Sequence, residues 1–123
     1  DEALCLDKTG YVCEGVGENI FIVRDGALLT PPLSSGALDG ITRALIIRLA
    51  KKMGIEVIER NITPNELFTA DEAFFTGTAA EVAPIGKVNN RVIGEGKPGP
   101  VTKRIMQAFE KATRDPAEGT PIQ

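Results

Sequence analysis

NIFIVRDGALL, residues 19–29, is the stretch that decides the fold class of this 123-residue chain. Two apolar runs flank Asp25 and Gly26, residue types that tolerate the positive φ angles of a tight turn. The stretch therefore predicts a β-hairpin. Upstream, ALCL and YVC indicate two further short strands joined by the turn-like DKTG. We expect an antiparallel meander to open the domain.

Two longer segments downstream have the periodicity of amphipathic helices. Residues 41–53 form the first, with Asp39 expected as its N-cap and Gly54 as its stop. Its expected apolar stripe is Ile41, Leu45, Leu49 and Met53, with Ala44 and Ile46 beside it. Residues 99–114 predict the closing helix. Its expected stripe is Val101, Ile105, Ala108, Phe109 and Ala112.

Shorter elements are expected between these helices. EVIER and EAFFT predict strands, TPNELFTA predicts a short helix capped by Thr63 with Pro64 first, and GTAAEV predicts a turn. APIGKVNNRVIG predicts two more short strands around Asn89 and Asn90. The predicted fold class is therefore α/β, a mixed sheet or pseudo-barrel of short strands flanked by two main helices. Residues 115–123 are expected to be a flexible tail.

Composition and charge exclude several classes of protein. The chain is 42% hydrophobic and 25% charged with a net charge of -3, as in ordinary globular domains. Its adjacent basic pairs, Lys51-Lys52 and Lys103-Arg104, lie on expected helix faces and form no nucleic-acid footprint. No apolar run approaches the roughly 20 residues that cross a bilayer, and the N-terminus lacks the shape of a signal peptide. We expect a cytoplasmic protein with neither nucleic-acid nor membrane partners.

Few residue types are available for catalysis. The chain has no histidine and two cysteines, which excludes a His-assisted nucleophile and a four-Cys zinc site, and we expect no metal. We interpret Cys5 and Cys13 as buried reduced thiols rather than a disulfide, because nothing in the sequence indicates secretion. EGVGENIF lacks the spacing of a dinucleotide site and leads into a strand rather than a helix.

Three loops carry groups suited to a small polar ligand. In the first, EGVGEN, Gly15 and Gly17 allow a ligand to approach the backbone, and Glu14 and Glu18 supply negative charge at the edge of a sheet. The alternative for this loop is a β-bulge with two exposed acids.

The other two loops offer hydrogen-bond donors. In ALDGITR, the N–H groups of Gly40, Ile41 and Thr42 form an anion seat at a helix start, together with the threonine hydroxyl. The alternative is a simple N-cap at Asp39. In FFTGTAAE, residues 76–80 offer hydroxyls and unobstructed amides, and the alternative is a plain turn. Each loop alone is weakly specific, but their order and spacing are not.

EGVGENIF, then LLTPP with GALDGITR, then FFTGTAAEVAPIGKVNNRVIGEGKPGPVTKRI closely resembles the C-terminal cofactor domain of class IV (fold type IV) pyridoxal-phosphate aminotransferases. Within that class, the resemblance is strongest to the branched-chain amino acid aminotransferases. It covers residues 2–114. Val16 departs from the pattern, since a smaller residue is expected there.

The resemblance implies a cofactor role for each loop. Glu14 matches the carboxylate that pairs with the pyridine nitrogen of pyridoxal 5'-phosphate and keeps the ring protonated. Glu18 matches a second acid, which we interpret as orienting polar neighbours without touching the ring. The groups that hold the cofactor phosphate correspond to Ile41, Thr42 and Thr78.

The resemblance also implies a substrate site. Amides of Thr78 and Ala79, with Ala80 nearby, match those that hold the carboxylate of the amino acid substrate. Arg43 and Arg48 invite assignment as phosphate ligands, but we interpret them as helix-surface residues.

The family's Schiff-base lysine is expected to be missing from this chain. It lies on a strand upstream of the first motif, farther from it than Lys8, which we interpret as a solvated turn residue. The smaller N-terminal domain, which adds an arginine to the phosphate site, is also expected to be absent. Residues 1–123 are therefore expected to be the C-terminal cofactor-binding domain of a longer enzyme, and to be inactive alone.

The implied activity of the parent enzyme is transamination between leucine, isoleucine or valine and 2-oxoglutarate, in a homo-oligomer. Two alternatives stay open. D-Amino acid aminotransferase and aminodeoxychorismate lyase share the fold, although their first motif tends to lack the second acid present here as Glu18. The other alternative is a non-catalytic domain whose DGITR and GTAAE loops bind a phosphate-bearing ligand or a partner chain.

Overall fold

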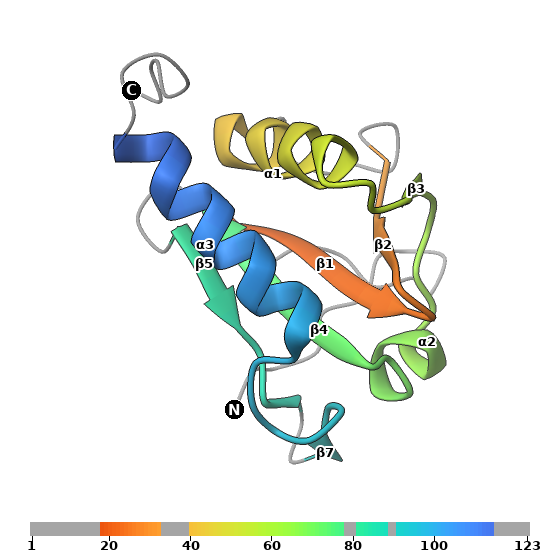
Figure 1. Cartoon of the computed structure of the whole chain (residues 1–123). Helices are drawn as coiled ribbons and strands as arrows, with labels where there is room; N and C mark the ends of the chain where they lie inside the picture. The colour runs from red at the N-terminus through yellow and green to blue at the C-terminus, as the bar shows by residue number, and fades with distance from the viewer. Residues whose placement is uncertain (1–17, 33–39, 78–80, 89–90, 115–123) are drawn as a thin grey trace.

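The computed structural model describes residues 18–32, 40–77, 81–88 and 91–114 (Figure 1). Among these residues, the main sheet has the strand order β3-β2-β1-β4-β5, and β6 pairs separately with β7. The main-sheet strands are β1 (Glu18–Arg24), β2 (Ala27–Thr30), β3 (Val57–Glu59), β4 (Glu72–Gly77) and β5 (Glu81–Pro84). The other elements are β6 (Lys87–Val88), β7 (Arg91–Val92), α1 (Ile41–Lys52), α2 (Pro64–Phe68) and α3 (Pro100–Arg114).

The hairpin at the centre of the sheet forms as predicted. Asp25 and Gly26 have φ angles of 50° and 80°, and Arg24 lies opposite Ala27 in the antiparallel pair of β1 and β2. Along its other edge β1 pairs antiparallel with β4, whereas β2 pairs parallel with β3. The expected α/β class with a mixed sheet is confirmed, and β1 is its middle strand.

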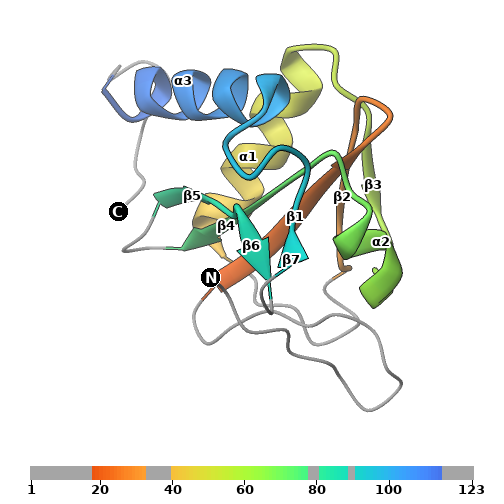
Figure 2. The same cartoon turned by 90° about the horizontal axis from the view of Figure 1, so that it is seen from below.

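Alternating side chains of β1 divide the core into two layers. Phe21 belongs to the layer that α1 and α3 cover, and it stacks on Phe74 of β4 with ring centroids 5.1 Å apart. Ile20 and Ile22 belong to the opposite layer, which includes residues of α2, β5 and β6. Figure 2 shows α3 on one side of the sheet and α2 on the other.

The start of α1 differs from its prediction. The N-cap is Gly40, with no side-chain cap hydrogen bond, so the predicted cap at Asp39 is wrong. The helix begins one residue after a glycine whose backbone is extended, and a glycine has no side chain with which to cap. At the other end Gly54, with a φ of 82°, follows the helix as predicted.

The apolar stripes of the two main helices are largely confirmed. In α1, Ala44 is exposed, which is contrary to prediction, while Ile46 and Ala50 are fully buried. The face that meets the sheet is therefore slightly rotated from the predicted stripe. In α3 the predicted stripe contacts the same core layer. Its members are Val101, Ile105, Ala108, Phe109 and Ala112.

Arg43 is the largest departure from the sequence prediction. Its interpretation as a helix-surface residue is wrong, because its side chain is only 6% exposed. The first turn of α1 lies over the ends of β2 and β3, where Arg43 Nη2 donates to the Pro31 carbonyl at 3.1 Å and to Glu59 Oε1 at 2.9 Å. Arg48 is exposed, as predicted.

The shorter elements mostly follow their local signals. Thr63 and Glu66 form a capping box, and Pro64 is the first residue of α2. The turn predicted for GTAAEV is shorter than expected, because Gly77 belongs to β4 and Glu81 to β5. The pair of β6 and β7 is confirmed. The strands, lysine and cysteines predicted before residue 18, and the tail after residue 114, lie outside the described residues.

Acid should destabilise the capping box of α2. Arg60 Nη2 lies 2.7 Å from Glu66 Oε2, and this pair, with the amide of Thr63, lowers the pKa of Glu66 from 4.5 to about 2. A depressed pKa in the folded state stabilises the protein above the unfolded value, and this stabilisation is lost as the pH falls from about 4.5 toward 2. Glu66→Gln should cost about 1–2 kcal/mol at neutral pH, since solvent screens a pair whose arginine is 46% exposed.

Urea unfolding at a series of pH values tests this expectation. Glu66→Gln should flatten the pH dependence of the unfolding free energy between about pH 5 and 2. Glu95→Gln is the matched control, because the Glu95 side chain is 84% exposed and should leave the dependence unchanged. Equal pH profiles for Glu66→Gln and the unaltered protein would contradict the assignment.

Candidate functional site

The pairing of β1 with β4 brings two of the three sequence motifs to one end of the sheet. Glu18 lies opposite Gly77, and Asn19 lies opposite Thr76. EGVGEN therefore ends where GTAAE begins, on neighbouring strands, although the two motifs are far apart in the sequence.

The first turn of α1 meets the same end of the sheet. The Gly40 backbone approaches Asn19 so closely that a Cβ built there would lie 2.6 Å from Asn19 Oδ1. Thr42, the second residue of α1, is 7% exposed. In Figure 1 the start of α1, the start of β1 and the end of β4 lie on the same side of the molecule. The described part of ALDGITR therefore lies at the same end of the sheet as the described parts of EGVGEN and GTAAE.

Thr76 adds an unsatisfied polar group to this place. Its side chain is fully buried, and its hydroxyl makes no hydrogen bond in the part of the chain that the structure describes. Thr76 shares a sheet face with Phe74, the face that α1 covers. A buried hydroxyl without a partner costs about 1–3 kcal/mol, so a hydrogen bond to this hydroxyl would be favourable.

The start of α1 is electrostatically suited to an anion. Gly40, the N-cap residue, provides no side-chain cap, and the first turn of the helix contains no acidic residue. The first N–H groups and the positive end of the helix dipole, at Ile41 and Thr42, are of the kind that suits an anion. Arg43, in the same turn, carries a positive charge that is paired with the partly exposed carboxylate of Glu59. These features fit a phosphate group.

The structure locates part of the predicted site. Thr42 and the backbone of Ile41 form the start of α1, and the backbone of Glu18 begins β1. The remaining predicted residues, Glu14, Thr78, Ala79 and Ala80, lie outside the described residues. Sequence reasoning gave no separate role to Thr76 or Asn19. A sequence signal for both residues exists, because each is a polar residue near one end of an otherwise apolar strand.

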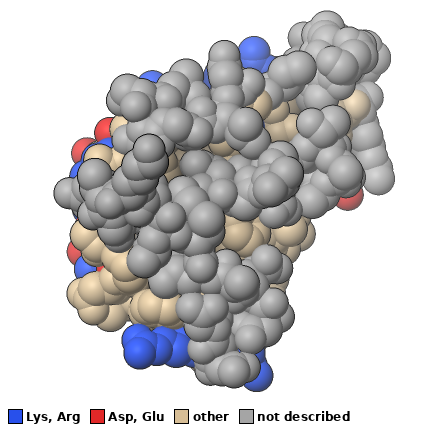
Figure 3. Space-filling model, turned by 180° about the vertical axis from the view of Figure 1, so that it is seen from behind, with Lys and Arg blue, Asp and Glu red and all other residues tan. Residues whose placement is uncertain are grey.

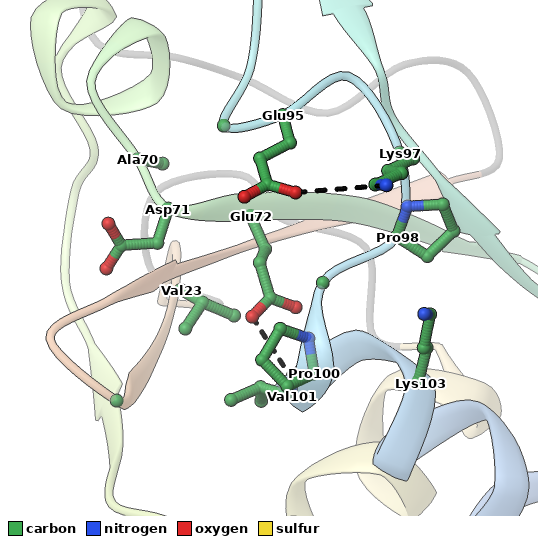
Figure 4. A pocket seen from close by; sticks show the side chains of 13 residues that line it. Val23, Ala70, Asp71, Glu72, Glu95, Lys97, Pro98, Pro100, Val101 and Lys103 are labelled. Carbon is green, nitrogen blue, oxygen red and sulfur yellow. Dashed lines mark hydrogen bonds and ion pairs between the residues drawn. The ribbon is translucent and has the colours of Figure 1, made fainter.

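A surface hollow lies at the opposite end of the sheet (Figure 4). It is lined by Val23 and Glu72, the last cross-strand pair of β1 and β4. The buried Glu72 carboxylate accepts hydrogen bonds from the amides of Val101 at 3.1 Å and Thr102 at 2.6 Å. A Cβ at Gly99 would overlap this carboxyl group. The central acid of the hollow therefore caps α3, away from the three motifs.

Comparison with known proteins assigns the chain to a family. The model of the class IV aminotransferases matches residues 1–88, and the chain belongs to this family, as predicted. Within the family it is similar to branched-chain amino acid aminotransferases. That enzyme from Escherichia coli K12 is 56% identical over 108 residues, which cover 88% of this chain and 35% of the relative. A putative one from Methanocaldococcus jannaschii is 50% identical over 110 residues, covering 89% and 38%.

A solved structure supports the same fold. The branched-chain aminotransferase of the archaeon Thermoproteus uzoniensis, crystallised with norvaline, matches with a TM-score of 0.84 and 50% identity. This match covers 90% of this chain and 36% of that one. The chain thus spans little more than a third of the length of the relatives that it matches.

A second solved branched-chain amino acid aminotransferase is complexed with N-(5'-phosphopyridoxyl)-L-glutamate. It matches with a TM-score of 0.88 and 48% identity, over 96% of this chain and 40% of that one.

Within the described ranges of the present chain, no helix is long and apolar enough to cross a bilayer, and no cluster of metal-ligating side chains occurs.

Replacing Gly40 should disturb the start of α1. In Gly40→Ala the new methyl group would clash with Asn19 Oδ1, so either the buried Asn19 side chain or the first turn of α1 must move. We expect the affinity of the apoprotein for pyridoxal 5'-phosphate to fall roughly tenfold, as for the loss of about one to two kcal/mol at a helix terminus. A fluorescence titration measures this affinity.

Gly26→Ala is the matched control for this experiment. Gly26 has a φ of 80°, so alanine there is strained and should lower the melting temperature, but the hairpin lies at the other end of β1. Its cofactor affinity should stay unchanged. If the two variants lose affinity equally, Gly40 has no special place in the site.

Proposed function

We propose that the protein carrying this chain is a pyridoxal-phosphate-dependent branched-chain amino acid aminotransferase. It transfers the amino group between leucine, isoleucine or valine and 2-oxoglutarate. The observation that carries this proposal is the meeting of three motifs at the start of α1, in a chain 56% identical to such an enzyme. Names of relatives alone would support the family, whereas the meeting of the motifs supports a cofactor site.

The described residues fit a phosphate-bearing cofactor. Gly40 provides no side-chain cap for α1, the first turn of this helix has no acid, and Thr76 carries a buried hydroxyl without a partner among the described residues. The phosphate would be held by Ile41, Thr42 and Thr78. Amide and hydroxyl donors at a helix start bind such a group through direct hydrogen bonds and the helix dipole.

Glu14 is proposed to hold a proton on the pyridine nitrogen. When bound, pyridoxal phosphate supplies a ring that accepts the electron pair left when the substrate loses its Cα proton. A carboxylate beside the ring nitrogen makes a charge-assisted hydrogen bond worth about 1.5–3 kcal/mol, and about 1.4 kcal/mol raises a pKa by one unit. Glu14 precedes β1 by a few residues in the sequence, and the start of β1 lies at the end of the sheet where the motifs meet.

Two further groups complete the proposed site. Glu18, at the start of β1, orients polar neighbours of the ring. Thr78, Ala79 and Ala80 bind the carboxylate of the amino acid through backbone amides. These three residues connect β4 to β5, which are adjacent antiparallel strands. The strand ends that this connection joins, Gly77 and Glu81, therefore lie at the same end of the sheet as the start of β1.

The whole enzyme requires more than this chain. We propose that residues 1–123 are its C-terminal cofactor-binding domain. The matched region covers 35% of the Escherichia coli relative, which supports a chain that forms only part of such an enzyme. The amine that moves the substrate proton would come from a lysine upstream of Glu14, and an N-terminal domain would close the pocket. We also propose that the full-length enzyme is a homo-oligomer in the cytoplasm.

Replacing Glu14 tests the proposed chemistry in the full-length protein. Glu14→Ala should lower kcat roughly 10- to 150-fold, which corresponds to the loss of one charge-assisted hydrogen bond. The affinity for the cofactor phosphate should be nearly retained. Glu14→Gln should also lower kcat, because a neutral amide lacks the negative charge that favours the protonated ring. A kcat unchanged in both variants would favour a non-catalytic phosphate-binding domain.

The isolated chain provides a second test. With added pyridoxal 5'-phosphate, leucine and 2-oxoglutarate, residues 1–123 should form glutamate no faster than the free cofactor does. The reason is that the proposed catalytic amine is outside the chain. A coupled glutamate assay measures the rate, and the full-length protein is the positive control. Turnover by the isolated chain above the free-cofactor background would show that the proposed division of the site is wrong.

A further inference from the structure

Arg43 occupies an unusual position for a cation. It is the third residue of α1, and its side chain is 6% exposed. Positive side chains are unfavourable near the N-terminus of a helix, because they face the positive end of its dipole. Burial adds a desolvation cost that only good hydrogen bonds offset. The position of Arg43 therefore calls for a reason beyond the stability of α1.

The contacts of Arg43 tie the first turn of α1 to two parallel strands. Nη2 donates both to the carbonyl of Pro31, which follows β2, and to the carboxylate of Glu59, which ends β3. β2 and β3 are paired in register at Thr30 and Glu59. One guanidinium thus holds the helix start against the ends of both strands.

The charge of Arg43 is incompletely neutralised. Glu59 is its ion-pair partner, but the Glu59 side chain is 45% exposed, so solvent screens its negative charge. The buried Nε of Arg43 makes no hydrogen bond with any described group. The first turn of α1, all of it within the described residues, contains no acid to balance the guanidinium. Among the described residues, the charge of Arg43 beside the amides of Ile41 and Thr42 is therefore balanced only by the partly exposed Glu59.

We propose that Arg43 is a positioning residue for the anion seat at the start of α1. It acts through the helix, by fixing the first turn so that the amides of Ile41 and Thr42 point at a phosphate group, and by adding positive charge behind them. This inference rests on the proposed function, because it takes the phosphate of the cofactor as the anion. Thr42 touches the ligand in this arrangement, whereas Arg43 touches Pro31 and Glu59.

The test compares two ligands of the full-length apoprotein, pyridoxal 5'-phosphate and pyridoxal, which lacks the phosphate. Arg43→Met should weaken binding of the phosphorylated ligand about 5- to 30-fold and that of pyridoxal less than about twofold. Arg43→Lys keeps the charge but not the planar fork, so its loss should be intermediate. Arg48→Met, in an exposed position of the same helix, should change neither affinity.

Glu59→Gln separates charge from geometry. Glutamine keeps an oxygen that accepts the Arg43 hydrogen bond and removes the negative charge. We expect this variant to bind pyridoxal 5'-phosphate about two- to threefold more tightly, with pyridoxal unchanged. If Arg43 had a purely structural role, Arg43→Met would lower the melting temperature without changing the ratio of the affinities for pyridoxal 5'-phosphate and pyridoxal.

The outcomes distinguish this inference from the proposed function. Equal losses for both ligands in Arg43→Met, or an unchanged affinity ratio in Glu59→Gln, would overturn the role of Arg43 alone. If Arg43→Met does not fold, Glu59→Gln and Arg43→Lys decide the question by the same ratio. Failure of the unaltered full-length protein to bind either ligand would overturn the proposed function.

Discussion

The antiparallel register of β1 against β4 is the constraint on which the rest of the structure depends. Side chains of a strand alternate between two faces, so a slip by one residue would move every apolar side chain of β1 to the wrong core layer. The stacking of Phe21 on Phe74 holds this register on the helix-covered face. With the register fixed, Asn19 must lie beside Thr76. The meeting of the motifs is thus a consequence of core packing.

The two ends of this strand pair have different tasks. At one end Glu72 caps α3, so a buried carboxylate holds a helix against the sheet. At the other end Gly40, the N-cap residue of α1, lies against Asn19. The Glu72 carboxylate thus caps the start of α3, whereas the N-cap residue of α1 is a glycine without a side-chain cap. Figure 3, which views the molecule from behind, shows basic side chains in blue at the lower edge and charges of both signs along one side.

Several features were predictable because their causes are local. The hairpin follows from Asp25-Gly26, α2 follows from Thr63, Pro64 and Glu66, and the stop of α1 follows from Gly54. Predictions failed where distant residues decide the environment. Asp39 was a reasonable cap by residue type, but the extended residue before α1 is Gly40. Arg43 was expected on the surface because arginine on a helix usually is, yet β2 and β3 supply its partners.

By itself, the sequence determined the fold class, the family and the residue types of the candidate site, since turn chemistry, apolar periodicity and motif order are all written in short stretches. Only the tertiary structure decided that Arg43 is buried, that Glu72 caps α3, and that Thr76 has a buried hydroxyl without a partner among the described residues. The physical reason is that burial and hydrogen bonding depend on contacts between residues far apart in the chain. No local pattern specifies which strand end a helix will cover.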